Sequence, residues 1–439
     1  MKEKLLEKWK KGWLALGMII LVLGSYTFVQ GEEESRHEQE KAALVFSVLS
    51  DIHVKKGEQG SVQKFQEALR QINEHAPNQD AFIALGDLTD RGAKEEYEQF
   101  FNIYNKMKQP QATSLFAIGN HEYRDGLSIS KTQERFLQMT GMEALYFHKK
   151  IKGYDFIVLG PESGLTKGYY SQKQIDWLSG ELEKAAQQNP NKPIFVFLHH
   201  PMKNTVYGSK WTSGEEIYQA MKKFPQVVAF SGHTHYPLED PRSIHQKDFT
   251  SIATSSVSYL WPGPGYLQGE LTPENQLLSQ GLIVEVFKDR IVINKRDFHK
   301  NDWTNAPWEV VYPINKNEFV YTEKRDQIKP EFLMGSYIRQ HKEKTTANSL
   351  EVSFTQAVDN LLVHSYKVIV TERKTGKRVK EFKALSEFYK DPVPNPMTLP
   401  IQGLKAGTTY TIKIVAIDAF GNESSMITGI IRTSLGSIE

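Results

Sequence analysis

The stretch LVFSVLSDIHV, residues Leu44 to Val54, joins a short apolar run to a cluster of polar side chains. Its first six residues predict a buried strand, because a continuous apolar run of about four to eight residues is typical of one. Asp51 and His53 follow directly behind the end of this strand. The same arrangement of an apolar strand followed by polar residues recurs along the chain. It therefore helps to predict both the fold and the functional site.

Further apolar runs alternate with amphipathic segments up to about Ser251. Strands are predicted at AFIAL, SLFAI, YDFIVL, PIFVFL and QVVAF, which begin at residues 81, 114, 154, 193 and 226. Helices are predicted at 61–76 and 171–188, and the second opens with Ser171 and Gln174 at the spacing of a capping box. This alternation predicts an α/β fold with a layered β-sandwich core flanked by helices. After about Ser251, IATSS, GLIVEVF and RIVINKR predict strands that complete a second sheet.

A change of pattern near Gln327 predicts a separate C-terminal unit. Strands and polar turns now alternate, and Tyr410, Ile412, Ile414 and Ala416 share one face at period two. With LKAGTTY placing Tyr410 at the start of this strand, the segment 330–435 resembles a fibronectin type III domain. The resemblance implies an all-β sandwich there, and the catalytic unit would then span residues 44–325.

The N-terminus predicts engagement with a membrane. Five lysines in MKEKLLEKWKK precede the uncharged run GWLALGMIILVLGSYTFVQ, so residues 1–31 are either a cleaved signal peptide or a retained anchor. The acidic segment that follows predicts a polar tether at 32–43. With the lysines on the cytoplasmic side, the rest of the chain would lie outside the cytoplasmic membrane, secreted or anchored at the cell surface.

Composition excludes several classes of site. The chain has no cysteine, so any metal must be held by His, Asp, Glu or Asn, and no disulfide or thiolate nucleophile exists. Its 54 basic and 52 acidic residues leave a formal charge of only +2. This balance provides no electrostatic footprint for nucleic acid, and none is expected as a structural partner.

Polar clusters follow several of the predicted strands. Because ligands of an open α/β sheet gather outside the carboxyl ends of its strands, the loops behind these strands can converge on one site. The clusters lie in SDIHV, LGDLTDRG, IGNHE, FLHHP and SGHTHYP, and supply Asp51, His53, Asp87, Asn120, His121, His199, His233 and His235. Carboxylate, carboxamide and imidazole groups together suit a pair of divalent cations, with a carboxylate such as Asp87 bridging both. Two ions about 3.5 to 4 Å apart can generate a bridging hydroxide that attacks phosphorus.

These motifs, in this order, resemble those of the calcineurin-like metallophosphoesterases over residues 44–311. The resemblance implies a metallophosphoesterase fold and two divalent ions, each Mn, Fe, Zn, Co or Ni. It implies one ion on Asp51, His53 and His235 and the other on Asn120, His199 and His233. Asp87 would bridge them, His121 would be a catalytic acid or phosphoryl ligand, and Asp90 would orient His121 through its carboxylate.

Neighbouring residues have less specific roles. His200 is interpreted as a residue that supports the ligands from behind or simply packs, Glu122 as a brace of its loop, and Arg91 as either a phosphate contact or a surface residue. The aromatic segments YLWPGPGY (259–266) and DWTNAPW (302–308) either wall the mouth of the site or simply pack.

The expected function is hydrolysis of phosphomonoesters or phosphodiesters, including nucleotide-type substrates. HHP and GHTH are more similar to the cyclic-nucleotide phosphodiesterase and purple-acid-phosphatase branches than to the protein phosphatases or nucleotidases. The alternative is a surface-binding or adhesion protein with a vestigial metal site, whose C-terminal domain contacts the cell surface or wall. Intact residues at each motif position favour the enzyme.

Overall fold

The computed structural model describes residues 41–261, 265–267, 272 and 274–435. The chain divides into two units, residues 1–43 and 44–439, and only the second is described at length. The predicted signal or anchor at 1–31, and most of the predicted tether at 32–43, lie outside the described residues. Within those residues, no helix is long and apolar enough to cross a bilayer.

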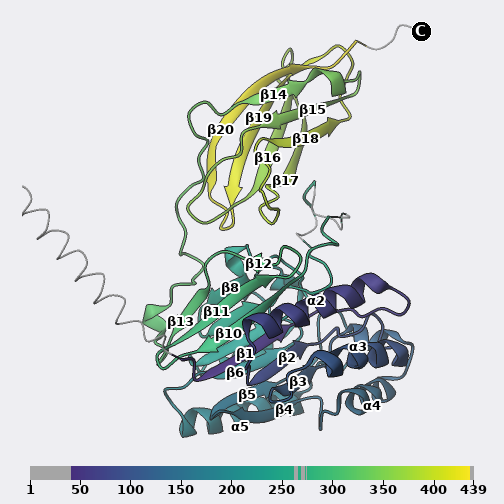
Figure 1. Cartoon of the computed structure of the whole chain (residues 1–439). Helices are drawn as coiled ribbons and strands as arrows, with labels where there is room; N and C mark the ends of the chain where they lie inside the picture. The colour runs from purple at the N-terminus through teal and green to yellow at the C-terminus, as the bar shows by residue number, and fades with distance from the viewer. Residues whose placement is uncertain (1–40, 262–264, 268–271, 273, 436–439) are drawn as a thin grey trace, which may run out of the picture. The chain divides into compact units, whose positions relative to one another are not determined.

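The first sheet has the strand order β12-β11-β10-β1-β2-β3, with β13 also paired to β11 (Figure 1). Its strands are β1 (Leu44–Leu49), β2 (Ala81–Leu85), β3 (Thr113–Ala117), β10 (Gln280–Val286), β11 (Arg290–Asp297), β12 (Asp302–Trp303) and β13 (Trp308–Val311). β1, β2 and β3 are parallel and confirm the predicted strands, whereas β10 is antiparallel to β1.

The second sheet has the order β4-β5-β6-β7-β9-β8. Its strands are β4 (Phe147–Ile151), β5 (Tyr154–Val158), β6 (Ile194–Leu198), β7 (Val227–Ser231), β8 (Ile244–Gln246) and β9 (Thr250–Ala253). Here β5, β6, β7 and β9 are parallel. The prediction that all strands after Ser251 complete a second sheet is wrong in part. β9 does so, but β10 and β11 extend the first sheet, where Val48 pairs with Leu282.

The hydrophobic core lies between the two sheets, with a second layer of packing on the outer face of each. Phe46 of β1 contacts four phenylalanines of the other sheet, at centroid distances of 5.0 to 6.1 Å: Phe156, Phe195, Phe197 and Phe230. Helices α2 (Gln59–His75), α3 (Lys94–Met107) and α4 (Ile129–Thr140) pack with first-sheet residues, and α5 (Gln172–Gln188) and α6 (Glu215–Met221) with second-sheet residues. Mixed α/β sheets with helices on their flanks agree with the predicted layered core.

The start of α5 realises only half of the predicted capping box. The Ser171 hydroxyl accepts a hydrogen bond from the amide of Gln174 at 3.3 Å, as an N-cap should. The Gln174 side chain, however, bonds both main-chain groups of Gly160 in the loop behind β5, at 3.0 and 3.1 Å. Gln174 therefore anchors the helix to the sheet instead of closing the box.

The C-terminal part of the chain is an all-β region. It forms a three-stranded sheet, β14-β15-β18, and a four-stranded sheet, β17-β16-β19-β20, and side chains of both contribute to one hydrophobic cluster. The strands are β14 (Ile338–His341), β15 (Ser349–Phe354), β16 (Val363–Glu372), β17 (Arg378–Leu385), β18 (Met397–Gln402), β19 (Thr409–Asp418) and β20 (Glu423–Arg432). Tyr410 is buried, and its hydroxyl accepts a hydrogen bond from the amide of Lys405, as a tyrosine corner would. The fibronectin-like sandwich itself stays a proposal.

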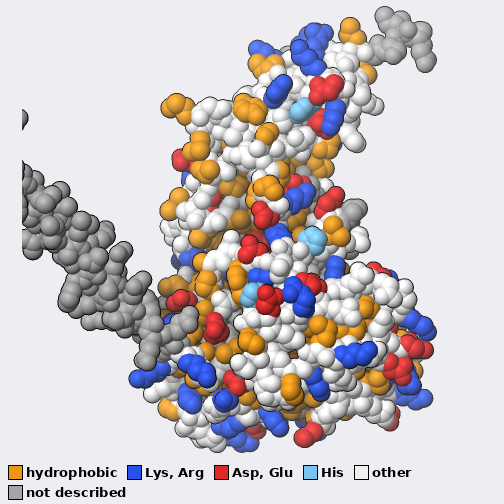
Figure 2. Space-filling model, viewed as in Figure 1, with side chains coloured by type: hydrophobic (Ala, Val, Ile, Leu, Met, Phe, Trp, Pro, Cys, Tyr) orange, Lys and Arg blue, Asp and Glu red, His pale blue; other side chains and the backbone are white. Residues whose placement is uncertain are grey.

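Basic and acidic side chains are interspersed on the face drawn in Figure 2. This mixture agrees with the near-zero formal charge of the chain.

Candidate metal centre

The parallel strands of both sheets end at the predicted site residues. Asp51 and His53 follow β1, Asp87 follows β2, and Asn120 follows β3. The second sheet supplies His199 behind β6 and the pair His233 and His235 behind β7. All seven side chains are brought together although up to 184 positions separate them, and all but His233 are fully buried.

The backbone turns sharply at these strand ends. Five site residues have positive φ, between 49° and 68°, a region that side chains other than glycine rarely adopt: Asp51, His53, Asp87, His233 and His235. A Cβ at Gly119 would collide with the Asp87 carboxylate, and one at Gly232 would collide with the Ser50 hydroxyl. Backbone strain of this kind persists where the surrounding structure holds it, and it clusters at functional sites.

The first group of ligand atoms comes from Asp51, His53 and His235. Asp51 Oδ1 lies 3.0 Å from His235 Nε2 and 3.9 Å from His53 Nε2. The other oxygen, Oδ2, accepts hydrogen bonds from the Ser50 hydroxyl at 2.5 Å and the His233 amide at 2.8 Å. Asp51 thus keeps one carboxylate oxygen fixed and turns the other toward two imidazoles.

Asp87 lies between this first group and a second. Its Oδ2 is 3.8 Å from His53 Nε2 and 3.3 Å from His199 Nε2. His199 Nε2 is also 3.2 Å from Oδ1 of Asn120, and the His233 ring lies 5.2 Å from the His199 ring. One oxygen of Asp87 therefore faces both groups, which is the position a bridging carboxylate requires.

Three buried atoms of the first group suit a cation. Within the described part of the chain, Asp51 Oδ1 and both ring nitrogens of His53 are buried and have no hydrogen-bond partner. Buried polar atoms are nearly always paired in proteins, so such orphans need an explanation. The donor set of carboxylate, imidazole and carboxamide suits a divalent transition metal, and the residues present fit the ion that such a site implies.

The charge states of the site favour metal binding. Burial opposes ionisation of Asp51, but the imidazoles of His235 and His199 outweigh it and hold the pKa of Asp51 below its ordinary value. Burial lowers the pKa of His53 to about 3 and that of His233 to about 4, so both are neutral ligands at neutral pH. Although burial opposes it, Asp87 and Asp51 raise the pKa of His199 to about 9. A bound cation would replace that proton.

Main-chain carbonyls orient two of the imidazoles. His199 Nδ1 lies 2.7 Å from the carbonyl of Leu85, and His235 Nδ1 lies 3.0 Å from the carbonyl of Tyr259. When each Nδ1 donates to its carbonyl, Nε2 is left with a lone pair for a cation. The Tyr259 ring also packs 4.3 Å from the His235 ring.

His121 faces the site but differs from the other histidines in its surroundings. Its Nε2 lies 3.8 Å from Asp87 Oδ2, and its amide donates to Asp87 Oδ1 at 2.8 Å. Its Nδ1 is 2.8 Å from the main-chain carbonyl of Asp90. Asp90 therefore contacts His121 as expected, but through its carbonyl instead of its carboxylate.

Arg124 was not identified from the sequence. Its Nη1 lies 3.0 Å from Nδ1 of His121, one turn along the short helix His121–Arg124, and its carbonyl accepts a hydrogen bond from the exposed Arg91. Arg91 is thus tied to the surface of this loop.

Glu122 braces the loops, as predicted. Its carboxylate accepts from the amides of Asp87, Thr89 and Gly119, at 2.9, 3.1 and 2.7 Å, and from the Thr89 hydroxyl. Burial and then the charge of Asp87 raise the pKa of Glu122 to about 7. The carboxylate fixes the relative positions of the loops behind β2 and β3.

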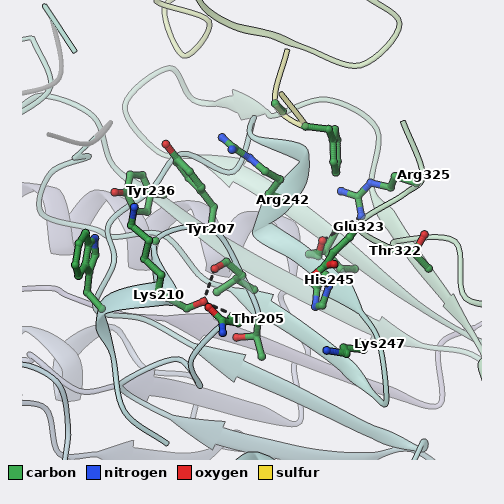
Figure 3. Close-up of a pocket in the computed structure, with 18 of the residues that line it drawn as sticks. Thr205, Tyr207, Lys210, Tyr236, Arg242, His245, Lys247, Thr322, Glu323 and Arg325 are labelled. Carbon is green, nitrogen blue, oxygen red and sulfur yellow. Dashed lines mark hydrogen bonds and ion pairs between the residues drawn. The ribbon is translucent and has the colours of Figure 1, made fainter. Parts of the chain in front are cut away.

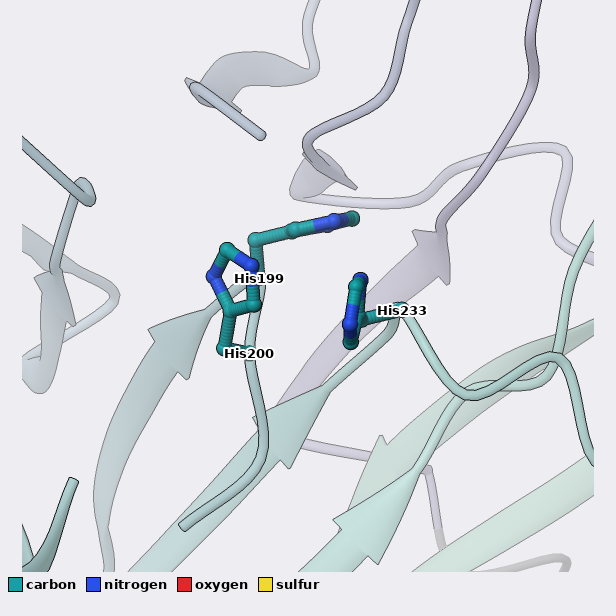
Figure 4. Close-up of side chains that lie close together, drawn as sticks. All are labelled: His199, His200 and His233. Atoms are coloured by element: carbon teal, nitrogen blue, oxygen red, sulfur yellow. The ribbon is translucent and has the colours of Figure 1, made fainter. Parts of the chain in front are cut away.

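His200 packs beside two of the predicted metal ligands, within the range of its interpretation as a supporting or packing residue. Its ring is 4.4 Å from the ring of His233 and 4.8 Å from that of His199, and one nitrogen from each of the three lies within 4.8 Å of the others (Figure 4). Burial lowers the pKa of His200, so its imidazole is neutral.

The aromatic residues of the segments 259–266 and 302–308 lie in different surroundings. Tyr259 lies at the metal centre, whereas Trp308 is buried in the core and Trp303 packs against His75. Of residues 302–308, Trp308 is thus a packing residue, while Trp303 is 41% exposed.

Comparisons with known proteins agree with this geometry. Residues 44–237 match the family model described as calcineurin-like phosphoesterase. The chain is 26% identical to a 3′,5′-cyclic-nucleotide phosphodiesterase of Nostoc sp., over 45% of this chain and 73% of that protein. It is 25% identical to a protein of Arcobacter nitrofigilis named "Probable glycerophosphodiester phosphodiesterase GpdQ" (44% and 72%), and 25% identical to a 3′,5′-cyclic adenosine monophosphate phosphodiesterase of Haemophilus influenzae (45% and 72%).

The matched segment contains all seven predicted metal ligands and His121. Residues 44–237 carry a calcineurin-like phosphoesterase domain. The protein is a metal-dependent phosphoester hydrolase.

Proposed function

We propose that this protein hydrolyses phosphodiesters with two divalent metal ions. The observation that carries the proposal is the position of Asp87, one oxygen of which faces His53 on one side and His199 on the other. A pair of ions held there would supply a nucleophilic hydroxide and neutralise charge on the phosphoryl oxygens. The relatives named as phosphodiesterases support a diester as the substrate.

The residues of the chain divide into holding and proton-transfer roles. Asp51, His53 and His235 would hold one ion, Asn120, His199 and His233 the other, and Asp87 both. His121 would protonate the leaving oxygen from Nε2. Its Nδ1 lies 2.8 Å from the Asp90 carbonyl, so a transferable proton is on Nε2, the nitrogen that faces Asp87, when the ring is in the imidazolium form.

A pocket of about 770 Å³ lies beside Tyr236, the residue that follows the predicted ligand His235 in the chain (Figure 3). Tyr236 lines it, and the Tyr207 ring packs 4.3 Å from the Tyr236 ring. The Arg242 guanidinium lies 3.6 Å over the Tyr207 ring and is paired with Asp240. Aromatic faces therefore form one side of the pocket.

The rest of the lining is mixed and includes basic side chains together with the acidic Glu323. Lys210, Lys247 and Arg325 line the pocket, and within the described residues none of the three has a carboxylate at ion-pair distance. Unpaired cations beside aromatic rings favour a ligand with a planar or sugar ring and a further anionic group. A diester has a second organic group to place there, whereas a simple phosphomonoester has a smaller part beyond the metals.

Diester substrates with and without an extra charge test this assignment. We expect faster hydrolysis of the 4-nitrophenyl ester of thymidine 5′-phosphate than of 4-nitrophenyl phosphate. Adding a 3′-phosphate to the thymidine should lower KM, and replacing both Lys210 and Lys247 with alanine should raise that KM about 5-fold, a loss of about 1 kcal/mol. The KM of the analogue without the 3′-phosphate should change little.

The matched control is Lys222→Ala with Lys223→Ala, two lysines that do not line the pocket. A preference for the monoester would contradict the diester assignment. An equal change of KM for both thymidine esters would show that the two lysines of the pocket do not bind the 3′-phosphate.

We also propose that the enzyme acts outside the cytoplasmic membrane, secreted or anchored. The lysine-rich N-terminus and the uncharged run behind it support this location. Proteinase digestion of intact cells tests it, since a protected catalytic unit would contradict the proposal.

Contact of the C-terminal region with the cell surface or wall is proposed on its all-β character alone. Loss of surface retention without loss of hydrolysis, in a chain ending at residue 325, would support that role.

A further inference from the structure

Three aspartates from distant parts of the chain meet in the C-terminal all-β region. Asp326 precedes β14, Asp359 lies between β15 and β16, and Asp418 is the last residue of β19. One oxygen from each lies within 4.8 Å of the others. Asp326 and Asp418 are only 5% and 2% exposed, and Asp359 is half-buried. We call these three residues the aspartate cluster.

Two oxygens of the aspartate cluster have nothing to bind. In the described part of the chain, Oδ2 of Asp326 and Oδ1 of Asp359 are buried and lack a hydrogen-bond partner. The second oxygen of each carboxylate is held: Asp326 Oδ1 accepts from the Ile328 amide, and Asp359 Oδ2 from the amides of Leu361 and Leu362, at 2.8 to 3.0 Å. Each carboxylate is thus oriented through one oxygen, and the other oxygen is presented within the protein without a partner.

No basic side chain of the described residues lies at ion-pair distance from the aspartate cluster, although the charge of Arg325 interacts with that of Asp326. The neighbouring Arg325 donates its hydrogen bonds to main-chain carbonyls instead, those of Ile244 and Pro241. Three carboxylates so close together, with no cation at ion-pair distance, repel one another and are costly to bury.

Neutral amides complete the surroundings of the aspartate cluster. Asn422 donates from Nδ2 to Asp418 Oδ2 at 2.6 Å and to the carbonyl of Asp326 at 3.4 Å. Asn360 donates to Asp326 Oδ1 at 3.3 Å. These amides orient the carboxylates but bring no positive charge, so they leave the electrostatic repulsion in place.

We propose that the aspartate cluster binds one Ca²⁺. Calcium takes six to eight oxygen ligands at about 2.3 to 2.6 Å, with flexible geometry, and carboxylates on loops are its usual donors in proteins. The cluster offers only hard oxygen donors and no imidazole, unlike the histidine-rich metal centre. Main-chain carbonyls or water would complete the coordination shell.

A calcium ion here would cross-link three chain segments. The segments around Asp326 and Asp418 also contain Arg325, Ala419 and Phe420, which line the pocket described above. The Phe420 amide donates to Asp418 Oδ1 at 2.8 Å, so the cluster and this wall of the pocket share one loop. The ion would therefore fix the conformation of both segments.

Calcium titration of the full chain tests the proposal without using activity. After removal of metals with a chelator, isothermal titration calorimetry should show one Ca²⁺ per chain, and saturating Ca²⁺ should raise the unfolding midpoint by about 2 °C or more. The variant Asp359→Asn should bind Ca²⁺ at least about 10-fold more weakly, because ligand charge sets calcium affinity. The matched control, Asp289→Asn, changes an exposed aspartate between β10 and β11 that is not part of the cluster, and it should bind as the wild type does.

Two further observations keep the test decisive. The variant His235→Ala should retain calcium binding, which separates the aspartate cluster from the histidine-rich centre. Should Asp359→Asn fail to fold, as judged by circular dichroism, the calcium response of His235→Ala and of the wild type decides. Absence of binding in the wild type, equal binding in Asp359→Asn, or loss of binding in His235→Ala would each overturn the proposal.

Discussion

Replacing Asp87 with asparagine is expected to abolish hydrolysis. The change keeps the size of the side chain and an oxygen for the His121 amide, but it removes the charge that faces both His53 and His199. Metal binding should weaken at both positions, and turnover should fall by about 10³-fold or more, corresponding to a loss of about 4 kcal/mol in transition-state stabilisation. Metal content by elemental analysis and kcat/KM for a diester measure the two effects.

The control for this variant is Asp176→Asn, an equivalent change at an exposed residue of α5 whose carboxylate accepts a hydrogen bond from the Gln172 side chain. It should leave metal content and turnover unchanged. Full metal content and near-normal turnover in Asp87→Asn would show that Asp87 is not the shared ligand.

Replacing His121 with alanine should slow hydrolysis but leave the metals in place. His121 faces Asp87 but is expected to hold a proton instead of an ion, so its loss removes acid catalysis, which contributes about 10²- to 10⁴-fold. The loss should be larger for an alkyl leaving group than for 4-nitrophenolate, since a poor leaving group needs protonation more. Kinetics on both esters, with elemental analysis of the same samples, test this.

Asp90→Asn separates the two ways in which Asp90 could orient His121. The structure shows a contact through the main-chain carbonyl, which this change preserves, so the rate should fall less than 10-fold. A loss as large as that of His121→Ala would show that the carboxylate matters. A loss of metal from His121→Ala equal to that from Asp87→Asn would contradict the acid role of His121.

The sequence predicted the parts of the fold that depend on local pattern. Continuous apolar runs identified the parallel strands, and the polar residues directly behind them identified the site, because both follow from neighbouring positions in the chain. The pairing of β10 with β1 was not predicted. It joins segments more than 230 residues apart, and the apolar pattern of a strand does not specify its partner.

Contacts made through space account for most of what was missed at the site. The carbonyl of Tyr259 reaches His235, and Arg124 reaches His121, but neither residue type at its position indicates such a role. The left-handed conformations of residues such as Asp51 and His53 run against local preference, so no local signal could predict them. Likewise, Asp326, Asp359 and Asp418 lie too far apart in the chain to form a motif.

Two-metal hydrolysis is tested by the metal content of the purified full chain, measured together with diester hydrolysis before and after chelation. We expect about two transition-metal ions per chain, loss of hydrolysis when they are removed, and recovery when they are restored. A folded chain that hydrolyses the diester equally well after complete removal of metal would contradict two-metal hydrolysis.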